Sequence, residues 1–143
     1  MSTIQRMCPR LVVEGAAKAI EFYTAALGAK EIKRFTDDGG AIVHAELELG
    51  PYVIMVKDAD QYDPAPGQLG GSPAKAPSPG RDASRESAPS VIMSLEVDDV
   101  DALGRRMTEA GAAVVFPIAD QEYGERAGRL RDPYGHLWIL SQP

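Results

Sequence analysis

Two side chains in the first half of the sequence have the types and spacing of an acid–base or metal-binding pair. His44 is followed by Glu46, and Glu48 comes two residues further on. Alternate residues of a strand share a face, so the imidazole and both carboxylates are expected to point the same way. A neutral imidazole suits proton transfer near pH 7, and the carboxylates could attract a cationic drug or hold a metal. A hydrogen-bonding histidine on a charged strand face is the interpretation that we prefer.

The rest of the composition argues against several common kinds of site. The 143 residues include one cysteine, Cys8, and two histidines, which excludes an intramolecular disulfide and sulfur-rich metal sites. There is no Gly-rich phosphate loop, Ser/His/Asp arrangement or Cys/His nucleophile pair. A net charge of −6 argues against a nucleic-acid partner and weakly favours a cationic ligand. With no leader-like segment or long apolar run, we expect a cytoplasmic protein without membrane contact.

Two helices and eight strand-like segments are predicted to position these side chains. Apolar residues recur at helical spacing over 16–27 and over 100–110. Gly28 is expected to end the first helix, and Asp99 can act as the N-cap of the second. One segment rich in β-branched and aliphatic residues precedes each helix, and three more strand-like segments follow it. The predicted strands are 8–13, 30–35, 41–49, 52–57, 91–97, 113–118, 127–131 and 136–141.

The two halves of the chain match one another in sequence. Leu11 aligns with Leu95, and Met55 with Ile139, at the same separation of 84 positions. The shared order of five elements predicts a duplication, and therefore an α+β fold of two βαβββ modules. We expect a single domain with module one over 7–59, module two over 90–143, and a linker rich in proline and glycine over 60–89.

Strand alternation assigns each side chain to a face. The apolar series Val43, Ala45, Leu47 and Leu49 is predicted to face the helices, and Trp138 to lie in the core. The opposite face is predicted to carry Cys8, Arg10, Val12, Ile42, His44, Glu46, Glu48, Val53, Met55, Lys57, Ile92, Ser94, Glu96, Leu137, Ile139 and Ser141.

Several stretches resemble the vicinal oxygen chelate superfamily. In the first half these are 11–13, 19–23 and 26–29, and in the second half 95–100, 110–112 and 132–138. The superfamily includes glyoxalase I, extradiol dioxygenases, metal-dependent fosfomycin-resistance enzymes, and proteins that bind bleomycin or similar antibiotics unaltered. The resemblance implies paired modules whose curled mixed sheets form a cup, completed by a second subunit in a homodimer.

The resemblance also implies where metal ligands would lie, on the first and last strand of each module. The matching positions here are Cys8, Met55, Ile92 and Ile139. Isoleucine side chains have no donor atom, and a thiol with a thioether is a soft pair unsuited to Mg, Mn or Fe. We therefore expect neither a metal nor another cofactor.

The leading hypothesis is a bleomycin-resistance-type protein that sequesters a hydrophobic or aromatic antibiotic. Tyr123 is the best aromatic candidate in the polar segment 120–126, where superfamily members commonly have a rim loop. One alternative is a glyoxalase-like lyase or isomerase that uses His44 and Glu46, with or without a displaced divalent metal. A second alternative is a regulatory partner with a vestigial cup. No catalytic residue is assigned, and the predicted ligand-binding residues are Cys8, Arg10, His44, Glu46, Met55, Ile92, Ser94, Tyr123, Leu137 and Ile139.

Overall fold

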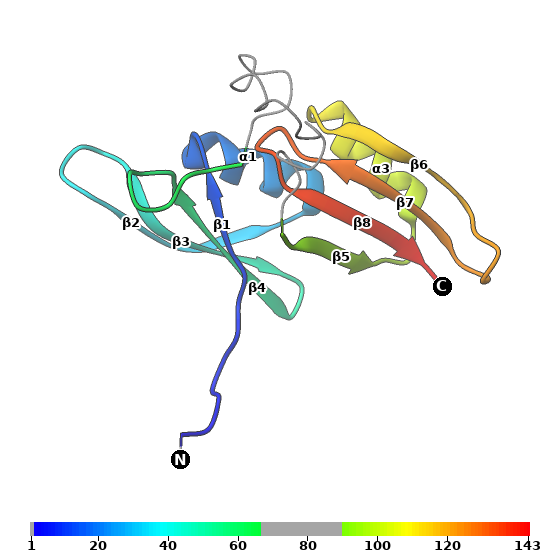
Figure 1. The fold of residues 1–143 in the computed structure, drawn as a ribbon, viewed down its shortest axis with the longest axis horizontal. Helices are drawn as coiled ribbons and strands as arrows, with labels where there is room; N and C mark the ends of the chain where they lie inside the picture. The colour runs from blue at the N-terminus through cyan, green and yellow to red at the C-terminus, as the bar shows by residue number, and fades with distance from the viewer. Residues whose placement is uncertain (1, 67–89) are drawn as a thin grey trace, which may run out of the picture. The chain divides into compact units, whose positions relative to one another are not determined.

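The computed structural model describes residues 2–66 and 90–143, which form two compact units (Figure 1). The first unit is Met1–Pro64 and the second is Ala65–Pro143. Most of the predicted linker, 67–89, lies outside the described residues. Neither helix in the described part of the chain has the length and apolar character that crossing a bilayer requires.

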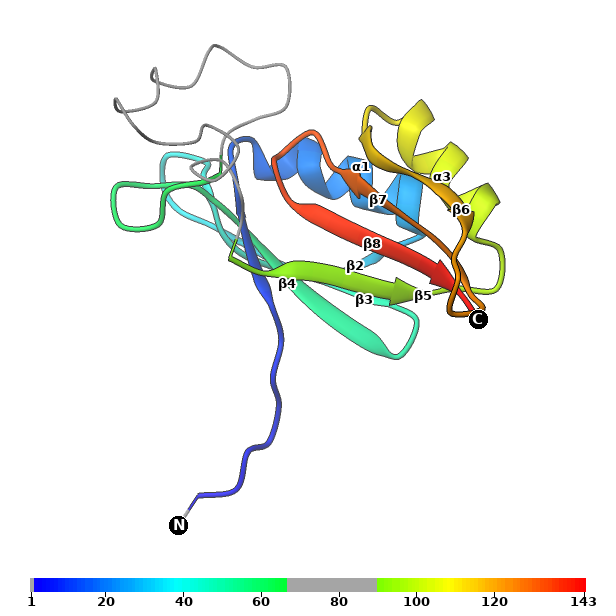
Figure 2. The same ribbon diagram turned by 45° about the vertical axis from the view of Figure 1, so that its right-hand side comes forward.

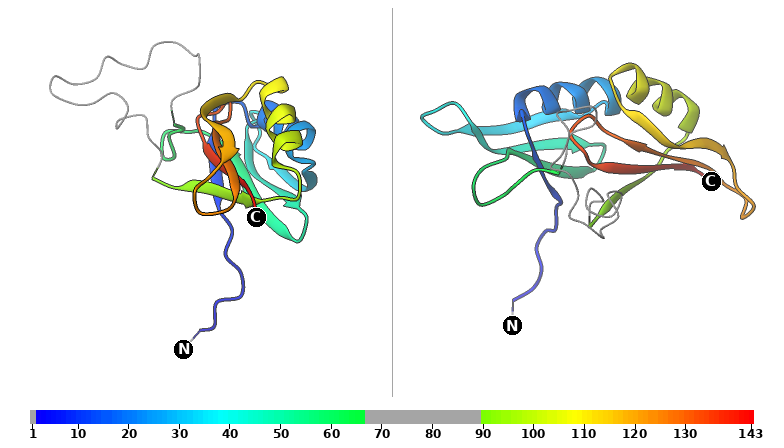
Figure 3. Two further views of the ribbon diagram at one scale, coloured as in Figure 1. Left: turned by 90° about the vertical axis from the view of Figure 1, so that its right-hand side faces the viewer. Right: turned by 45° about the horizontal axis from the view of Figure 1, so that its top comes forward.

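The first unit contains one helix and a four-stranded mixed sheet. The strands lie in the order β1-β4-β3-β2, with β1 parallel to β4 and the other neighbours antiparallel. The helix α1 packs against this sheet (Figure 3). The elements are β1 (Arg10–Val13), α1 (Ala16–Leu27), β2 (Lys30–Thr36), β3 (Ile42–Leu49) and β4 (Tyr52–Asp58).

The second unit repeats this topology. Its sheet has the order β5-β8-β7-β6, again with one parallel pair, β5 with β8 (Figure 2). The predicted pair of βαβββ modules is therefore confirmed, with strand ends that differ from prediction by one or two residues. The elements are β5 (Ile92–Glu96), α3 (Val100–Glu109), β6 (Ala113–Asp120), β7 (Arg126–Arg131) and β8 (Leu137–Gln142).

The helix α1 is held between two glycines and fixed to the sheet by Asp58. Gly15 (φ 86°) precedes it and Gly28 (φ 69°) ends it, both in the left-handed region that glycine adopts without strain. One Asp58 carboxylate oxygen accepts from Ala16 N at 2.7 Å, and the other accepts from Ile42 N at 2.7 Å. The same carboxylate thus joins the helix start to the beginning of β3.

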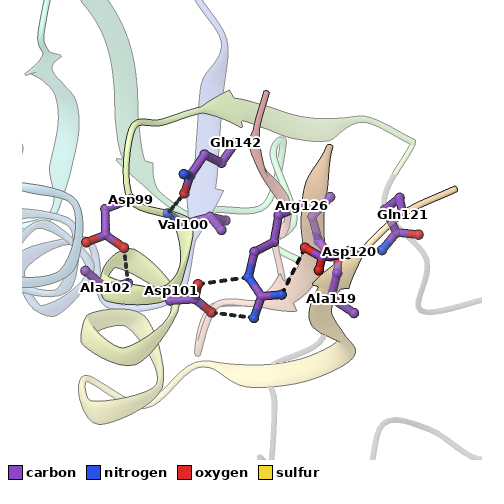
Figure 4. Close-up of polar contacts among 10 residues, drawn as sticks. Asp99, Val100, Asp101, Ala102, Ala119, Asp120, Gln121, Arg126 and Gln142 are labelled. Atoms are coloured by element: carbon purple, nitrogen blue, oxygen red, sulfur yellow. Dashed lines mark hydrogen bonds and ion pairs between the residues drawn. The ribbon is translucent and has the colours of Figure 1, made fainter. Parts of the chain in front are cut away.

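The helix α3 is joined to β6 and β7 by an arginine (Figure 4). Asp99 is the predicted N-cap, and its carboxylate accepts from Ala102 N at 3.0 Å. Arg126 Nε and Nη2 donate to the two Asp101 oxygens at 2.9 and 3.0 Å, and Arg126 Nη1 donates to Asp120 at 3.2 Å. The first turn of the helix is thereby fixed to the end of β6 and the start of β7.

Trp138 lies in the core of the second unit, as predicted. The indole is fully buried, and its Nε1 donates to Asp132 Oδ2 at 2.9 Å. The other oxygen, Asp132 Oδ1, accepts from Tyr134 N at 2.9 Å and His136 N at 3.0 Å. A buried carboxylate therefore shapes the turn before β8 and accepts the hydrogen bond of the buried indole.

The predicted face was wrong for two residues of β3. Phe35 pairs with His44, but the next residue, Thr36, pairs with Ile42, so Val43 is an extra residue in a bulge. The bulge reverses the alternation: Val43 is 45% exposed and Ile42 is 3% exposed. After the bulge the prediction is correct, because Ala45 and Leu47 are fully buried.

Candidate functional site

One residue from each strand of the first sheet forms a row across it. Arg10 pairs with Met55, Met55 with Glu46, and Glu46 with Lys33. The neighbouring residues Leu11, Val56 and Ala45 are buried, so this row faces away from α1. We call this row, with Arg6, Phe35 and His44, the first-sheet cluster.

Glu46 is the centre of the first-sheet cluster. Its Oε1 accepts from Arg6 Nη2 at 2.8 Å, and its Oε2 lies 2.7 Å from His44 Nε2 and 3.8 Å from Lys33 Nζ. The residue is 6% exposed. Hydrogen bonds from His44 and Arg6, together with the positive charges of Arg6 and Lys33, lower the pKa of Glu46 from 4.5 to about 2. At neutral pH this carboxylate is therefore ionised.

The contacts of His44 fit one neutral tautomer. Because the ionised Glu46 carboxylate only accepts, the proton belongs on His44 Nε2. Arg10 Nη2 lies 3.3 Å from Nδ1, and a guanidinium only donates, so Nδ1 contributes its lone pair. The Phe35 ring stacks on the imidazole at a centroid distance of 6.1 Å and an interplanar angle of 26°.

A corresponding row crosses the second sheet, but its chemistry is different. Ser94 pairs with Ile139, Ile139 with Arg129, and Arg129 with Phe116. The Arg129 guanidinium carbon lies 5.5 Å from the centroid of the Phe116 ring, and Phe116 is 59% exposed. By strand register, Arg129 corresponds to the central glutamate of the first row. This row therefore combines two apolar side chains with a serine, and has a stacked guanidinium in place of the carboxylate.

The predicted site residues fall on both sheets. The first-sheet cluster brings together Arg10, His44, Glu46 and Met55, which prediction placed on one face. On the second sheet, Ile92 pairs with Leu137 and Ser94 with Ile139. These four residues therefore lie on the same face of that sheet as the row that contains Arg129.

Two predicted residues lie outside the strands of both sheets. Cys8 is half-buried and precedes β1, which begins at Arg10 and not at residue 8 as predicted. Tyr123 is 72% exposed in the turn between β6 and β7.

Sequence reasoning missed several cluster residues. Lys33 and Phe35 lie two apart on β2, and this spacing was a usable signal for a shared face. Their partners on β3 depend on a register shift between Glu31 and Lys33, which alternation alone does not reveal. Arg6 precedes β1, so no strand pattern indicated it. On the second sheet, Arg129 and Phe116 were also missed.

The donor atoms of both rows do not fit a divalent metal ion. Residues 2–66 and 90–143 contain no group of three or more His, Cys, Asp or Glu side chains arranged to hold a metal. At one position where the resemblance implies a ligand, the Met55 thioether accepts from the Arg10 guanidinium at 3.7 Å. This cation would repel a metal, and Ile92 and Ile139 offer no donor atom.

A groove also lies on the helix side of the second unit. It has a volume of about 220 Å³ and is bordered by α3 and β6. Its lining includes Asp101, which is already paired with Arg126, and Ile118. None of the predicted site residues borders this groove.

Ionisation of Glu46 should make the free energy of unfolding depend on pH in acidic solution. Because the folded-state pKa is lowered, the stabilisation is complete above pH 4.5 and is lost as the pH falls toward about 2. We expect Glu46→Gln to lower the urea midpoint at pH 7, and this deficit to shrink as the pH falls from 5 to about 2. The measurement is urea unfolding followed by circular dichroism at a series of pH values.

Glu48→Gln provides the control for this pH dependence. It removes a carboxylate from the same strand without removing the contacts of the first-sheet cluster. The wild type and Glu48→Gln should give parallel midpoint curves. Parallel curves for the wild type and Glu46→Gln would contradict the expectation.

Curated relatives of this chain come from mycobacteria. The uncharacterized protein Mb0911c of Mycobacterium bovis is 37% identical over 142 residues, covering 96% of this chain and 82% of the relative. The uncharacterized protein Rv0887c of Mycobacterium tuberculosis is also 37% identical, covering 96% of this chain and 74% of the relative. These relatives support common ancestry over nearly the whole chain.

Solved structures share the fold. TioX from Micromonospora sp. ML1 is 26% identical with a TM-score of 0.64, covering 97% of this chain and 96% of TioX. The fosfomycin resistance protein FosX from Listeria monocytogenes, solved with Mn(II) and sulfate, is 15% identical. Its TM-score is 0.65, covering 99% of this chain and 94% of FosX, and at this identity the likeness concerns the fold alone.

The family model for the Glyoxalase/Bleomycin resistance protein/Dioxygenase superfamily matches residues 4–140. This match covers both βαβββ modules, and the neighbouring solved structures include members of the same superfamily. The chain therefore belongs to the Glyoxalase/Bleomycin resistance protein/Dioxygenase superfamily.

Proposed function

We propose that the chain is a metal-independent small-molecule binding protein of the bleomycin-resistance type, acting as a homodimer. It would sequester a hydrophobic or aromatic antibiotic without altering it. The observation that carries this proposal is the 3.7 Å contact between Arg10 Nη2 and Met55 Sδ. A cation beside a thioether, at a position that the resemblance assigns to a metal ligand, favours binding without a metal.

Each sheet, taken separately, carries apolar side chains suited to a ligand with apolar surface. Phe35 and Met55 provide an aromatic ring and an adaptable thioether on the first sheet. Ile92 and Phe116 are exposed on the second sheet. Apolar surface with a small number of convergent polar groups is the usual lining of a small-molecule site.

Isothermal titration against bleomycin-like and enediyne-like compounds tests this proposal. We expect at least one compound to bind with a Kd below about 1 mM, and the heat of binding to be unchanged by EDTA. Metal analysis of the purified protein should give no stoichiometric divalent ion. Failure of every compound to bind, or a stoichiometric ion that is lost in His44→Ala, would overturn the proposal.

A second candidate function is a glyoxalase-like lyase or isomerase. The 2.7 Å contact between His44 Nε2 and Glu46 Oε2 favours it, because a carboxylate that orients an imidazole is a common acid–base arrangement. Isomerisation of the hemithioacetal of methylglyoxal and glutathione, assayed with and without added Mn²⁺, discriminates the two functions. Turnover that disappears in His44→Gln would favour the enzyme, whereas the binding protein should give none.

A further inference from the structure

Arg10 differs from Arg6, Lys33 and Arg34 in its partners. Arg6 and Lys33 lie beside Glu46, and Arg34 Nε pairs with Glu31 at 2.6 Å. Arg10 Nη2 contacts only the His44 ring nitrogen and the Met55 sulfur, both uncharged. Among residues 2–66 and 90–143, Arg10 has no carboxylate partner, although its side chain is exposed.

The first-sheet cluster carries a local excess of positive charge. Arg6, Arg10 and Lys33 face a single carboxylate, Glu46, and the contacts of His44 fit a neutral ring. Asp60 and Asp63, which follow β4, lower this excess by one charge without removing it. Asp60 and Asp63 both bond to Lys57 Nζ, at 2.9 and 2.5 Å, and Lys57 is 7% exposed.

A planar aromatic surface lies next to the Arg10 guanidinium. Phe35 is 56% exposed and stacks on His44, and the edge of the same imidazole contacts Arg10 through Nδ1. A cation with unused donors and a stacking surface therefore lie side by side. Guanidinium N–H groups bind planar carboxylates with two parallel hydrogen bonds, and aromatic rings bind by offset stacking.

We propose that the first-sheet cluster binds a planar aromatic ligand through an anionic substituent, with Arg10 pairing to the anion and Phe35 stacking on the ring. This inference rests on the proposed small-molecule binding function and specifies the class of ligand. It differs from the expectation drawn from net charge, which weakly favoured a cation. The first-sheet cluster is locally positive, although the whole chain carries a formal charge of −6.

The test compares ligands that differ only in charge. The probes are 2-naphthoate, 2-naphthalenesulfonate and the neutral 2-naphthamide, titrated at millimolar concentration and followed by amide chemical shifts in NMR spectra. We expect 2-naphthoate to bind about tenfold more tightly than 2-naphthamide, with the largest shifts around Phe35 and His44. The sulfonate decides whether the site accepts anions in general or carboxylates in particular.

Three variants assign the effect to side chains. Arg10→Gln should abolish the preference for the acid over the amide, and Phe35→Ala should weaken both ligands by a similar factor. Arg34→Gln is the matched control, because it removes a positive charge from β2 whose partner is Glu31 and not a residue of the first-sheet cluster. The acid preference should be unchanged in this variant.

The outcomes separate this inference from the proposed function. Equal affinity for acid and amide, a preference that survives in Arg10→Gln, or no binding of either probe would each overturn the inference. In every one of these cases, the titrations with bleomycin-like and enediyne-like compounds still decide independently whether the protein sequesters a drug.

Discussion

Replacement of Asp132 by alanine is expected to destabilise the second unit by about 3–5 kcal/mol. The carboxylate is fully buried and accepts from Trp138 Nε1 and from the backbone N–H groups of Tyr134 and His136. A buried donor that loses its acceptor costs about 1–3 kcal/mol, and three donors lose theirs here. The turn before β8 would also lose the side chain that holds its shape.

The chain offers a direct probe for this effect. Trp138 is the single tryptophan, so its fluorescence during urea unfolding reports on the unit that contains Asp132. Asp132→Asn should have a free energy of unfolding between those of the wild type and Asp132→Ala. An amide keeps one acceptor oxygen, but its NH2 group faces N–H groups that also donate.

The control for Asp132 is Asp120→Ala. The Asp120 side chain is 87% exposed and pairs with Arg126 at 3.2 Å, and exposed ion pairs contribute roughly 0–1 kcal/mol. If Asp132→Ala lowers the free energy of unfolding no more than Asp120→Ala does, the role given to the buried carboxylate is contradicted.

Gly128→Ala is expected to be the second most damaging substitution, at about 3 kcal/mol. A Cβ atom at this position would lie 2.8 Å from both N and Cα of Ile118, and 2.6 Å from its Cγ1. Between the pairs Phe116–Arg129 and Ala119–Ala127, β6 has two residues where β7 has only Gly128. This bulge places backbone directly over the glycine, and backbone in a paired strand cannot move aside at low cost.

Gly104→Ala is a matched comparison because it involves the same isoleucine. A Cβ atom at Gly104 in α3 would meet Ile118 Cδ1, the flexible end of the side chain. Alanine also favours a helix over glycine by about 1 kcal/mol, so we expect little net change in stability. Thermal unfolding followed by Trp138 fluorescence should therefore separate the two variants clearly. Similar melting temperatures would show that the bulge backbone adapts, against our expectation.

The order of elements could be predicted from the sequence because local chemistry determines it. Gly28 ends α1 and Asp99 caps α3, and both signals depend on neighbours within a few residues. The match between Met55 and Ile139 reflected the real duplication, because these residues occupy the same position in each β-sheet. Strand alternation also predicted correctly that Ala45 and Leu47 are buried.

The bulges could not be predicted, because they depend on the partner strand. Nothing in the residues around Val43 indicates that Thr36 pairs with Ile42, and this single shift reverses the faces of Ile42 and Val43. The bulge opposite Gly128 is similar, since the glycine acquires its importance from Ile118 on another strand. A pattern with period two carries no information about an extra residue in the pairing.

That His44 and Glu46 share a strand face follows from the sequence alone, because residues two apart along a strand point to the same side. What the pair can do depends on residues that folding brings to it. Strand pairing brings Lys33 and Met55 beside Glu46, and Arg6 and Arg10 reach the pair from the start of the chain. These long-range contacts lower the pKa of Glu46 and, among residues 2–66 and 90–143, leave Arg10 without a carboxylate partner. Charge interactions depend on distance in space and not on separation in sequence.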